Sequence, residues 1–568
     1  MSNLLQKASI ITTPTAYDTG KILSVKPVQY YGPELVTNGN FATDSDWVTE
    51  GNSTIAVGTY QGKNAANINI LNTSTGSRIS QAFNYVNGKT YKVSVTVYVE
   101  SGNFRLDSSD SFVSGDFVST TTTGSWQTLT TNITAINTGS NYIWLRSILT
   151  VSQFYVNSVS VKEVLNADFD FSRNSSATRV GSNGLIQDVA SNLPRIDYTG
   201  GVGSWKFEPQ RTNLLTYSED FSNGFWSKRG ASVVGGQVSP NGGTSAFKLV
   251  ESSTTDIHKV FENFALGITT GTVVTTSVYA KAGERSILKL QPYIGTKYIY
   301  VNFDLSNGTV GLTSGDEISK KIELLSNGYY RCSITFLTDG TSVQTHFVLT
   351  DSNIAGVNPS YTGDGTSGLY IWGAQLEEGS YPTSYIITSG QSGGVTRLAD
   401  VANNAGSSDL INSTQGVLYA EIAAFADDLT SREINISDGS LSNTIAIIYN
   451  QPSNNIRFLV RASATTYVDI NIVITDITIS NKVAFKYKEN SFSAFINGFE
   501  LGSDNSGLVP TGNVLNELSF TRSTARAFYG NTKCVAVFKE ALTDLELECL
   551  SSWMSFSDLG INFGYTVE

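Results

Sequence analysis

Apolar and polar residues alternate in short segments along most of this chain. In "YKVSVTVYV" (91–99), the residues Val93, Val95, Val97 and Val99 occupy every second position. Successive side chains of a β-strand point to opposite faces, so this period predicts strands with one buried face. The pattern as a whole predicts an all-β protein built from antiparallel sheets.

Comparison of the chain with itself reveals a diverged duplication. Residues 34–57 resemble 213–236, because both have an apolar pair, a short polar turn, a Phe and then a Trp. In the same order, 89–106 matches 272–290, "GSWQTLTTNIT" matches "NGYYRCSITFL", and "QFYVNSVSVKEV" matches "GLYIWGAQLEEG". Each copy is therefore predicted to be an antiparallel β-sandwich.

The C-terminal part has a pattern of its own. A strand in "QGVLYAEIAAF" is followed by a hairpin in "VAFKYKENSFSAFINGFELGS" and by a last strand that leads into a short amphipathic helix. Thr543 and Glu546 have the spacing of a capping box at the start of that helix. Its predicted apolar side consists of Leu545, Leu547, Leu550 and Trp553.

The polar run "DFDFSRNSSATRVGSNGLIQDV" (168–189) lies between the two copies. It is too rich in aromatic and branched apolar residues for a free linker, and turns at "NGL" and "SNLPR" predict two short hairpins docked between domains. The predicted fold is three antiparallel β-sandwich (jelly-roll) domains in tandem with an N-terminal arm. The expected parts are a docking arm (1–33), a first jelly roll (34–165), a hairpin connector (166–212), a second jelly roll (213–390) and a C-terminal sandwich (391–568).

Charge and cysteine content narrow the possible partners. The net charge of −12 is spread along the chain without a basic block, which argues against nucleic acid and against an anionic membrane surface. The N-terminus lacks the pattern of a secretory signal and no apolar run is long enough for a membrane span, so synthesis in a cytosol and no membrane insertion are expected. The 3 cysteines have no metal-like spacing, and cores held by packing alone are expected.

Catalytic chemistry is not apparent in the sequence. His258 and His346 lie in separate strand-like contexts, and Glu377 with Glu378 is expected to be a solvated pair rather than a glycosidase pair. The glycine-rich run 363–368 lacks the lysine and the strand-to-helix context of a phosphate loop. The sequence predicts a protein without enzymatic activity and without a cofactor.

Binding residues are easier to nominate. Exposed aromatic faces stack on sugars, and the candidates in the strand-like segments are Tyr142, Trp144, Tyr155, Tyr370 and Trp372, although alternation requires many such rings to be buried. "TNGNFATDSD" offers oxygen donors for a structural calcium ion in Asn38, Asn40, Asp44 and Asp46, although turn formation without a metal is the favoured explanation of the same residues.

Three resemblances bear on the fold. The "GNF…W" opening, "SVTVYV", "GSWQTLT" and "FYVNSVSVKEV" resemble the jelly-roll carbohydrate-binding modules of bacterial glycoside hydrolases. "AFKYKENSFSAFINGFEL" with the terminal "ALTDLE" segment resembles a concanavalin-like or laminin-G-like sandwich. The connector resembles a pattern in phage virion proteins, carried here by Arg173, Ala177, Thr178, Arg179, Gly184, Pro194, Arg195, Tyr198, Arg211 and Asn213, with "GGVTRLADVAN" (393–403) as a further unit.

These resemblances imply a bacteriophage virion structural protein, a tail-fibre or appendage subunit that binds host or environmental glycans. The alternatives are a capsid-decorating head fibre and a secreted glycan-binding or glycan-hydrolysing protein. The implied location is the virion, and the implied assembly is a homo-oligomer such as a trimer. The N-terminal arm is expected either to dock on a neighbouring subunit or another virion protein, or to pack on the first sandwich; its apolar residues are Ile10, Ile11, Tyr17, Ile22 and Leu23.

Overall fold

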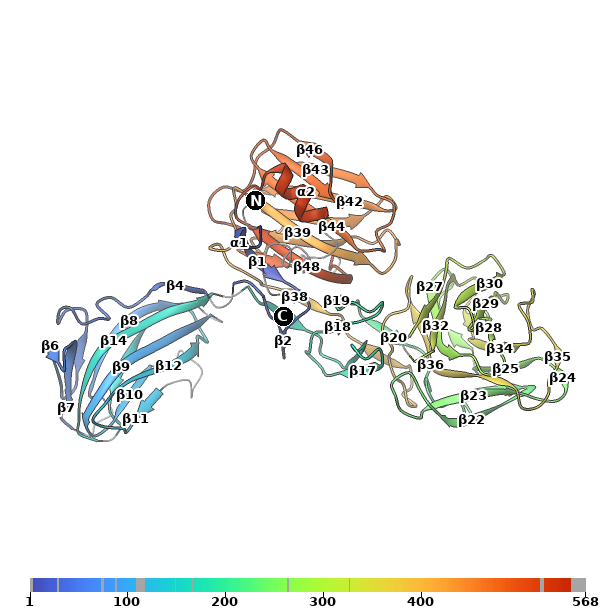
Figure 1. The fold of residues 1–568 in the computed structure, drawn as a ribbon, viewed down its shortest axis with the longest axis horizontal. Coiled ribbons are helices and arrows are strands. Elements are labelled where there is room, and N and C mark those ends of the chain that lie inside the picture. Colours follow the sequence, from blue (N-terminus) through green and yellow to red (C-terminus); the bar gives the residue numbers. More distant parts are fainter. Residues whose placement is uncertain are drawn as a thin grey trace. The chain divides into compact units, whose positions relative to one another are not determined.

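The computed structural model describes residues 4–27, 30–72, 76–86, 89–108, 118–148, 150–165, 167–262, 265–325, 327–521 and 526–552. The structure confirms an all-β fold in which every strand pair of the named sheets is antiparallel (Figure 1). It divides into two compact units, one of residues 28–166 and one of residues 1–27 with 167–568. Among the described residues, no helix is both long and apolar enough to span a membrane.

The unit 28–166 is the first sandwich. One sheet has the order β12 (Trp126–Thr134), β9 (Thr90–Ser101), β14 (Ser152–Leu165), β7 (Lys63–Ile70) and β6 (Ser53–Tyr60), with β4 (Tyr30–Glu34) paired to β14. The other has the order β11 (Val118–Thr120), β10 (Phe104–Ser108), β13 (Gly139–Arg146), β8 (Arg78–Tyr85) and β5 (Val48–Glu50). As predicted, Val93, Val95, Val97 and Val99 of β9 are buried in the core between the sheets.

The second sandwich has the same strand order with one further strand at the edge of each sheet, as the predicted duplication requires. Its first sheet is β22 (Ala231–Gln237), β23 (Ala246–Glu251), β36 (Gly368–Glu378), β27 (Val273–Lys281), β32 (Tyr330–Leu337) and β31 (Ser319–Leu324). Its second sheet is β21 (Trp226–Arg229), β25 (His258–Glu262), β34 (His346–Thr350), β28 (Ile287–Leu290), β29 (Val301–Asp304) and β30 (Thr309–Thr313).

The recurring Phe and Trp form the same packing in both copies. Phe41 stacks on Trp47 with ring centroids 5.2 Å apart, and the Trp47 indole N–H donates to the Asn38 carbonyl at 3.2 Å. In the second copy, Phe221 lies 5.0 Å from Trp226, whose N–H donates to the Tyr217 carbonyl at 2.8 Å. The motif therefore closes the start of each sandwich onto its core.

The C-terminal sandwich has one sheet with β48 (Gly530–Phe538), β39 (Gln415–Ala424), β44 (Asn481–Lys488), β45 (Phe492–Ile496) and β46 (Phe499–Asp504). The facing sheet is β43 (Thr465–Val473), β42 (Asn455–Ala462), β41 (Thr444–Asn450), β40 (Arg432–Ser437) and β47 (Glu517–Ser519). Helix α2 (Asp544–Ser552) begins with the predicted capping box, because Thr543 N donates to Glu546 Oε2 at 3.0 Å. Leu547 and Leu550 are buried, whereas Leu545 is exposed and Trp553 lies outside the described residues.

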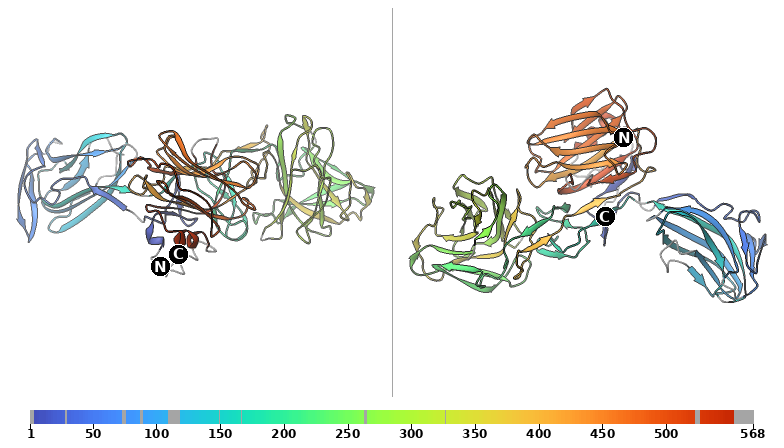
Figure 2. Two further views of the ribbon diagram at one scale, coloured as in Figure 1. Left: turned by 90° about the horizontal axis from the view of Figure 1, so that it is seen from above. Right: turned by 180° about the vertical axis from the view of Figure 1, so that it is seen from behind.

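Residues 4–27 of the N-terminal arm belong to the C-terminal sandwich and the connector, which neither expectation for the arm anticipated. The end of the arm, in β4, pairs with β14 of the first sandwich, as the packing expectation predicted. After α1 (Leu4–Lys7), strand β1 (Ala8–Thr12) pairs with β48, and Ile10 lies in the core of that sandwich. Figure 2 shows the N-terminus beside the C-terminal sandwich, which is coloured orange. Ile22 lies in the same core, and β3 (Lys21–Ile22), next to β2 (Tyr17–Asp18), pairs with β15 (Phe169–Ser172) of the connector. The arm is thus a structural edge strand within its own chain.

The connector forms two hairpins, but only the first has the predicted turn. Strands β16 (Ala177–Val180) and β17 (Ile186–Val189) flank "NGL", whereas β18 (Ile196–Asp197) and β19 (Ser204–Phe207) are joined by the glycine-rich turn 198–203. Gly200 and Gly201 have φ of +82° and +88°, a conformation that glycine adopts without strain. The segment "SNLPR" also turns, with Asn192 at a φ of +59°, but it joins β17 to β18, which do not pair with each other. Strand β19 pairs with β48 of the C-terminal sandwich, and apolar residues of the connector lie in the core of that sandwich.

Candidate functional site

A group of aromatic side chains lies on the outer face of the first sandwich. Trp126 of β12, Tyr98 of β9 and Tyr155 of β14 are neighbours in register across adjacent strands. Side chains alternate between the two faces of a strand, and the valines of β9 point into the core. Tyr98, which lies between two of these valines, therefore points outward, as do its cross-strand neighbours Trp126 and Tyr155. With Tyr60 at the end of β6, these four residues form what we call the aromatic platform.

The rings of the aromatic platform contact one another closely. Tyr60 and Tyr155 are parallel, with an interplanar angle of 3° and centroids 3.6 Å apart. Tyr98 meets Tyr60 edge-on at 5.2 Å and Trp126 at 5.8 Å. Tyr98 is buried beneath its neighbours, while Tyr60, Trp126 and Tyr155 are half-buried and keep part of their surface in solvent. An aromatic patch on an otherwise polar strand face is typical of a binding surface.

Polar groups border the platform. Tyr60 donates its hydroxyl to Glu100 Oε2 at 2.6 Å, and this hydrogen bond raises the pKa of Tyr60. The Lys63 ammonium group lies 4.9 Å from the centre of the Trp126 ring. Gln153 Nε2 donates to the Tyr155 hydroxyl at 3.3 Å and to Asn67 Oδ1 at 3.4 Å. The platform therefore combines apolar ring faces with amide, carboxylate and ammonium groups at its rim.

Of the aromatic residues nominated from sequence, only Tyr155 lies in the platform. Tyr142 and Trp144 are on β13 and point outward from the other sheet of the same sandwich. There Tyr142 is 44% exposed, and the Arg78 guanidinium covers the Trp144 ring at 4.0 Å. Sequence reasoning missed Tyr60, Tyr98 and Trp126. The position of Tyr98 between the buried valines of β9 could have indicated that its side chain lies on the outer face.

The other two nominated rings are on β36 of the second sandwich. Trp372 is 1% exposed and is enclosed by Tyr279 and Tyr385, with its indole N–H donating to Ser245 Oγ at 2.8 Å. It has no surface left for a ligand, so the structure does not support that prediction for Trp372. Tyr370 is half-buried beside the same cluster. The chain after β36 folds back over this face, which alternation within one strand could not reveal.

The proposed calcium ligands lie in the loop 38–46. Asn38 is occupied by the loop itself: its Nδ2 donates to the carbonyls of Thr43 and Ser45 at 2.8 Å, and its Oδ1 accepts from Ala42 N. Asn40 Oδ1 accepts from Ala42 N at 3.3 Å, Asp46 accepts from Ser45 Oγ, and Asp44 is exposed. In the part of the chain that the structure describes, no group of three or more His, Cys, Asp or Glu is arranged to hold a metal ion. Calcium binding stays a prediction.

The acidic pair Glu377 and Glu378 is not a solvated pair as expected. Glu377 is fully buried and accepts hydrogen bonds from Thr383 N at 2.7 Å, Thr383 Oγ1 at 2.6 Å and Gln375 Nε2 at 2.7 Å. Glu378 is exposed. Glu377 therefore fixes the return of the chain after β36. The two histidines, His258 and His346, are both buried.

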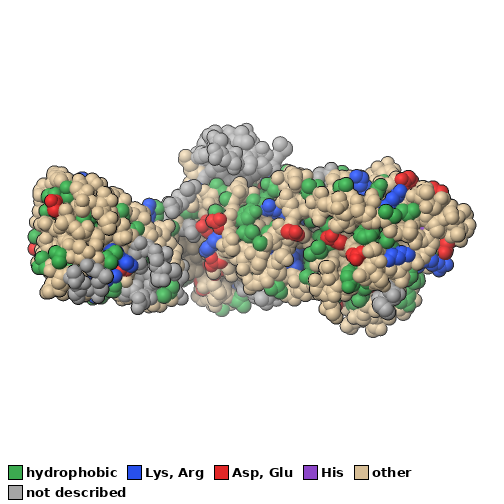
Figure 3. Space-filling view, turned by 90° about the horizontal axis from the view of Figure 1, so that it is seen from below, with side chains coloured by type: hydrophobic (Ala, Val, Ile, Leu, Met, Phe, Trp, Pro, Cys, Tyr) green, Lys and Arg blue, Asp and Glu red, His purple; other side chains and the backbone are tan. Residues whose placement is uncertain are grey.

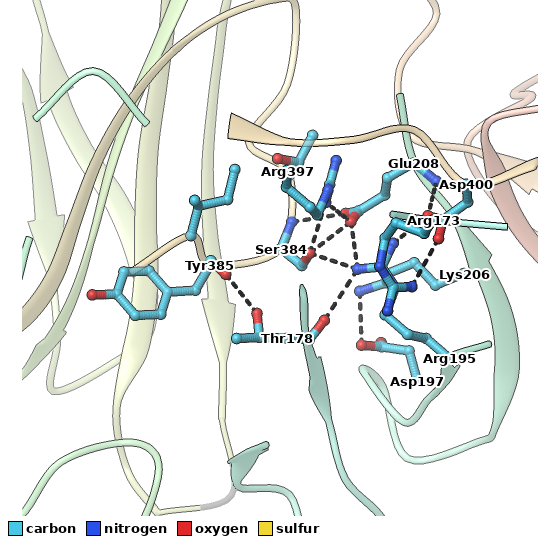
Figure 4. A network of polar contacts seen from close by, with 12 residues as sticks. Arg173, Thr178, Arg195, Asp197, Lys206, Glu208, Ser384, Tyr385, Arg397 and Asp400 are labelled. Atoms are coloured by element: carbon cyan, nitrogen blue, oxygen red, sulfur yellow. Dashed lines mark hydrogen bonds and ion pairs between the residues drawn. The ribbon is translucent and has the colours of Figure 1, made fainter. Parts of the chain in front are cut away.

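The connector motif forms a buried ionic network (Figure 4). Arg173 Nη1 lies 3.0 Å from Asp400, and Arg195 Nη1 lies 2.7 Å from Glu208 while its Nη2 bonds Asp400. Arg397 also pairs with Glu208, and Ser384 Oγ donates to the same carboxylate at 2.6 Å. These side chains come from the residue after β15, from the segments before β18 and after β19, from β37 (Val395–Arg397) and the residues that follow it, and from the tail of the second sandwich.

Electrostatics within this network favour the charged carboxylates. Burial alone would raise the pKa of Glu208, but the guanidinium groups of Arg397 and Arg195 hold it well below its ordinary value of 4.5. Near it, Lys206 pairs with Asp197 at 2.9 Å and helps to lower the pKa of Asp197 against its burial. Buried pairs of this kind fix one arrangement of the segments that carry them. The motif residues Arg173 and Arg195 thus have a structural role.

A cavity of about 1020 Å³ lies beside the network. Its walls carry charges of both signs, from Arg179, Lys206, Arg331, Glu323 and Asp428. The face of the molecule in Figure 3 likewise shows acidic and basic side chains interspersed among uncharged ones. Neither the cavity nor this face therefore favours a ligand of one particular charge.

The fold and sites define an all-β protein of tandem sandwiches with an outward aromatic platform. No protein-family model matches the chain, and no curated protein matches it in sequence. Among solved structures, it is similar to the CBM40 of a Ruminococcus gnavus sialidase (14% identity, 26% of this chain and 93% of that chain, TM-score 0.23). It is also similar to the CBM22 tandem of Paenibacillus barcinonensis Xyn10C (14% identity, 61% and 97%, TM-score 0.19) and to Trypanosoma rangeli sialidase (12% identity, 92% and 98%, TM-score 0.23).

The expectation of a protein without enzymatic activity is corrected by these comparisons. Solved structures of Trypanosoma rangeli sialidase align with more than nine-tenths of the chain, so the expectation is withdrawn. At 10–12% identity and TM-scores of 0.22–0.23, this likeness does not assign a reaction or a catalytic residue to the chain.

Proposed function

We propose that this protein binds glycans and that the aromatic platform of the first sandwich contacts the sugar. The observation that carries the proposal is the parallel pair of Tyr60 and Tyr155, partly exposed beside Trp126 on a polar strand face. Sugar rings present C–H faces that pack on aromatic rings, and their hydroxyl groups need hydrogen-bond partners. Glu100, Asn67 and Gln153 are such partners at the rim, as ligand sites with few, well-placed polar groups require.

A purely structural role is the main competing explanation, because cross-strand aromatic pairs also stabilise sheets. The test therefore measures binding and stability together. The full-length chain is titrated with polysaccharides and oligosaccharides selected on a glycan array, alongside the variants Tyr155→Ala and Trp126→Ala. The matched control is Tyr142→Ala, which removes an exposed tyrosine from the other sheet of the same sandwich.

Binding should weaken at least about tenfold in Tyr155→Ala and Trp126→Ala, equivalent to roughly 1.4 kcal/mol each, and should persist in Tyr142→Ala. If the platform variants lower Tm but bind with unchanged affinity, the rings serve only the sheet and the proposal is wrong. Release of reducing ends from a bound polysaccharide would add hydrolysis to binding.

The biological setting that we propose is a phage virion, as a tail-fibre or similar appendage subunit. Its support is the connector pattern around Arg173, Arg195 and Arg211, which resembles phage structural proteins. Assembly as a homo-oligomer such as a trimer is part of the same proposal, and light scattering measures it. Labelling the protein on intact particles by electron microscopy tests the setting, and a protein absent from particles favours the secreted alternative.

A further inference from the structure

The second sandwich carries a row of buried polar side chains on the outer face of one sheet. Lys259 of β25, Lys289 of β28 and Asn302 of β29 are in register with one another through Val348 of β34. Their chain neighbours Val260, Leu288 and Phe303 point into the core, so the polar row points away from it. Gln291 and His346 extend the row, and all five polar residues are at most 5% exposed.

A segment after β34, residues 351–360, covers this row, and we call it the strap. Lys289 Nζ donates to the carbonyls of Ile354 at 3.1 Å and Gly356 at 2.6 Å. Lys259 Nζ and Gln291 Nε2 donate to Asn358 Oδ1 at 3.1 and 2.8 Å. Asn302 Nδ2 donates to Asn353 Oδ1 at 2.8 Å.

Apolar packing does not hold the strap in place. Ile354 and Val357, its bulky aliphatic residues, are 45% and 46% exposed. Gly356 has a φ of +88°, and a Cβ there would meet open space. The strap is therefore attached to the sheet by hydrogen bonds, which the oxygen atoms of water or of a ligand can replace.

The two ammonium groups beneath the strap lack an anionic partner. Among the described residues, neither Lys259 nor Lys289 takes part in an ion pair of this sandwich; the cations that do are Arg229, Lys248, Arg285, Lys297, Lys320 and Lys321. Burial lowers the pKa of both lysines to about 8, with the charge of Arg229 adding to the effect on Lys259. Burying an ammonium group without a counter-charge is unfavourable, so these positions favour an incoming anion.

The first sandwich shows that this arrangement is specific to the second. On its corresponding sheet, Arg105 has the place of Lys289, since the matched segments end at Leu106 and Leu290, and Arg105 pairs in register with Arg146 of β13 as Lys289 does with Val348 of β34. Unlike Lys289, Arg105 has a carboxylate partner, Asp107. Asp107 is neutralised by Arg105 at 2.8 Å and by Arg146. The chain between β13 and β14 consists of residues 147–151 alone, so the first sandwich has no strap.

We propose that the strap is a movable cover over a binding site for an acidic saccharide, whose carboxylate is bound by Lys259 and Lys289. Oxygen atoms of the ligand replace the strap carbonyls and the Asn358 amide on the two lysines. Gln291 and Asn302 then bind hydroxyl groups, and Tyr300, whose ring lies 4.3 Å from Lys289 Nζ, offers an aromatic face. This site is separate from the aromatic platform and does not depend on it.

The probe is a uronate oligosaccharide, compared with its neutral methyl ester, in titrations of the full-length chain. Wild type should bind the uronate at least about tenfold more tightly than the ester. Lys289→Met, which keeps the side-chain length and removes the charge, should abolish this preference without lowering Tm. Asn358→Ala should raise the affinity for the uronate, because a weakened strap opens more often.

Two results would overturn the proposal. One is equal affinity of wild type for the uronate and the ester, and the other is a uronate preference that Lys289→Met leaves unchanged. Tyr155→Ala separates the two sites: if it removes all uronate binding while Lys289→Met removes none, the platform alone binds the ligand. In that case the glycan-binding proposal stands and the strap proposal does not.

Discussion

At the residue scale, the buried arginines explain why the connector has its sequence. Arg173, Arg195 and Arg397 converge on Asp400 and Glu208, carboxylates up to 227 positions away in the chain. Each guanidinium also donates to a backbone carbonyl, as Arg195 does to Thr178 O at 3.1 Å. Planar groups with several fixed donors suit such a junction better than lysine would.

Glu208→Gln should destabilise the unit that contains the network. The substitution leaves Arg195 and Arg397 without a full counter-charge, and breaking a buried pair in this way costs about 3–5 kcal/mol. Because the pKa of Glu208 is lower in the folded state than its ordinary 4.5, its contribution is complete above about pH 4.5 and is lost as pH falls further. The variant should therefore lose less stability than wild type between pH 4.5 and 2.5.

Thermal unfolding as a function of pH measures both effects. Glu489→Gln, at an exposed glutamate in the hairpin turn after β44, is the control and should leave Tm unchanged at every pH. A Glu208→Gln protein with wild-type Tm at neutral pH would mean that the network contributes no net stability.

At the element scale, the sequence predicted the features that depend on neighbouring residues better than the features that depend on pairing between distant segments. The alternation in β9, the Phe–Trp packing of both copies and the capping box at Thr543 depend on residues near one another in sequence, and all are present in the structure. The pairing of β1 with β48 and the enclosure of Trp372 join distant segments. A strand's period gives the side-chain face but neither its partner strand nor what later covers that face.

Removing the N-terminal residues 1–27 should lower the Tm of the C-terminal sandwich. The deletion exposes the edge of β48 and removes Ile10 from the core, and a large buried aliphatic residue alone is worth about 2–5 kcal/mol. Differential scanning calorimetry of the truncated chain measures this loss. Val25→Ala, at an exposed residue of the same segment, is the control. A truncated protein that melts like wild type would contradict the edge-strand role.

The two Phe–Trp pairs should act independently. Trp47→Ala should destabilise only the first sandwich, and Trp226→Ala only the second, each by about 3–5 kcal/mol, because the two rings lie in separate cores. Unfolding followed by calorimetry should show one shifted transition in each variant. A shift of both transitions by either substitution would show that the sandwiches unfold together.

At the scale of the whole molecule, the sequence predicted the number and class of the sandwiches but not how their segments combine. The arm, the connector and the segment before β39 form one sheet, in the order β2, β3, β15 and β38 (Val401–Asn403). The structure therefore has two compact units where the sequence suggested five consecutive parts. The predicted boundaries near 165–212 and 388–396 remain to be tested by limited proteolysis.

The central claim is that glycan binding resides in the first sandwich, and residues 28–166 produced alone test it most directly. Near-ultraviolet circular dichroism first establishes that the fragment is folded, as its separate core predicts. Calorimetric titration with a neutral glycan bound by the full-length chain should then give the same Kd, within about twofold, for the fragment as for the whole chain. A folded fragment that does not bind, while the full-length chain does, would contradict the account.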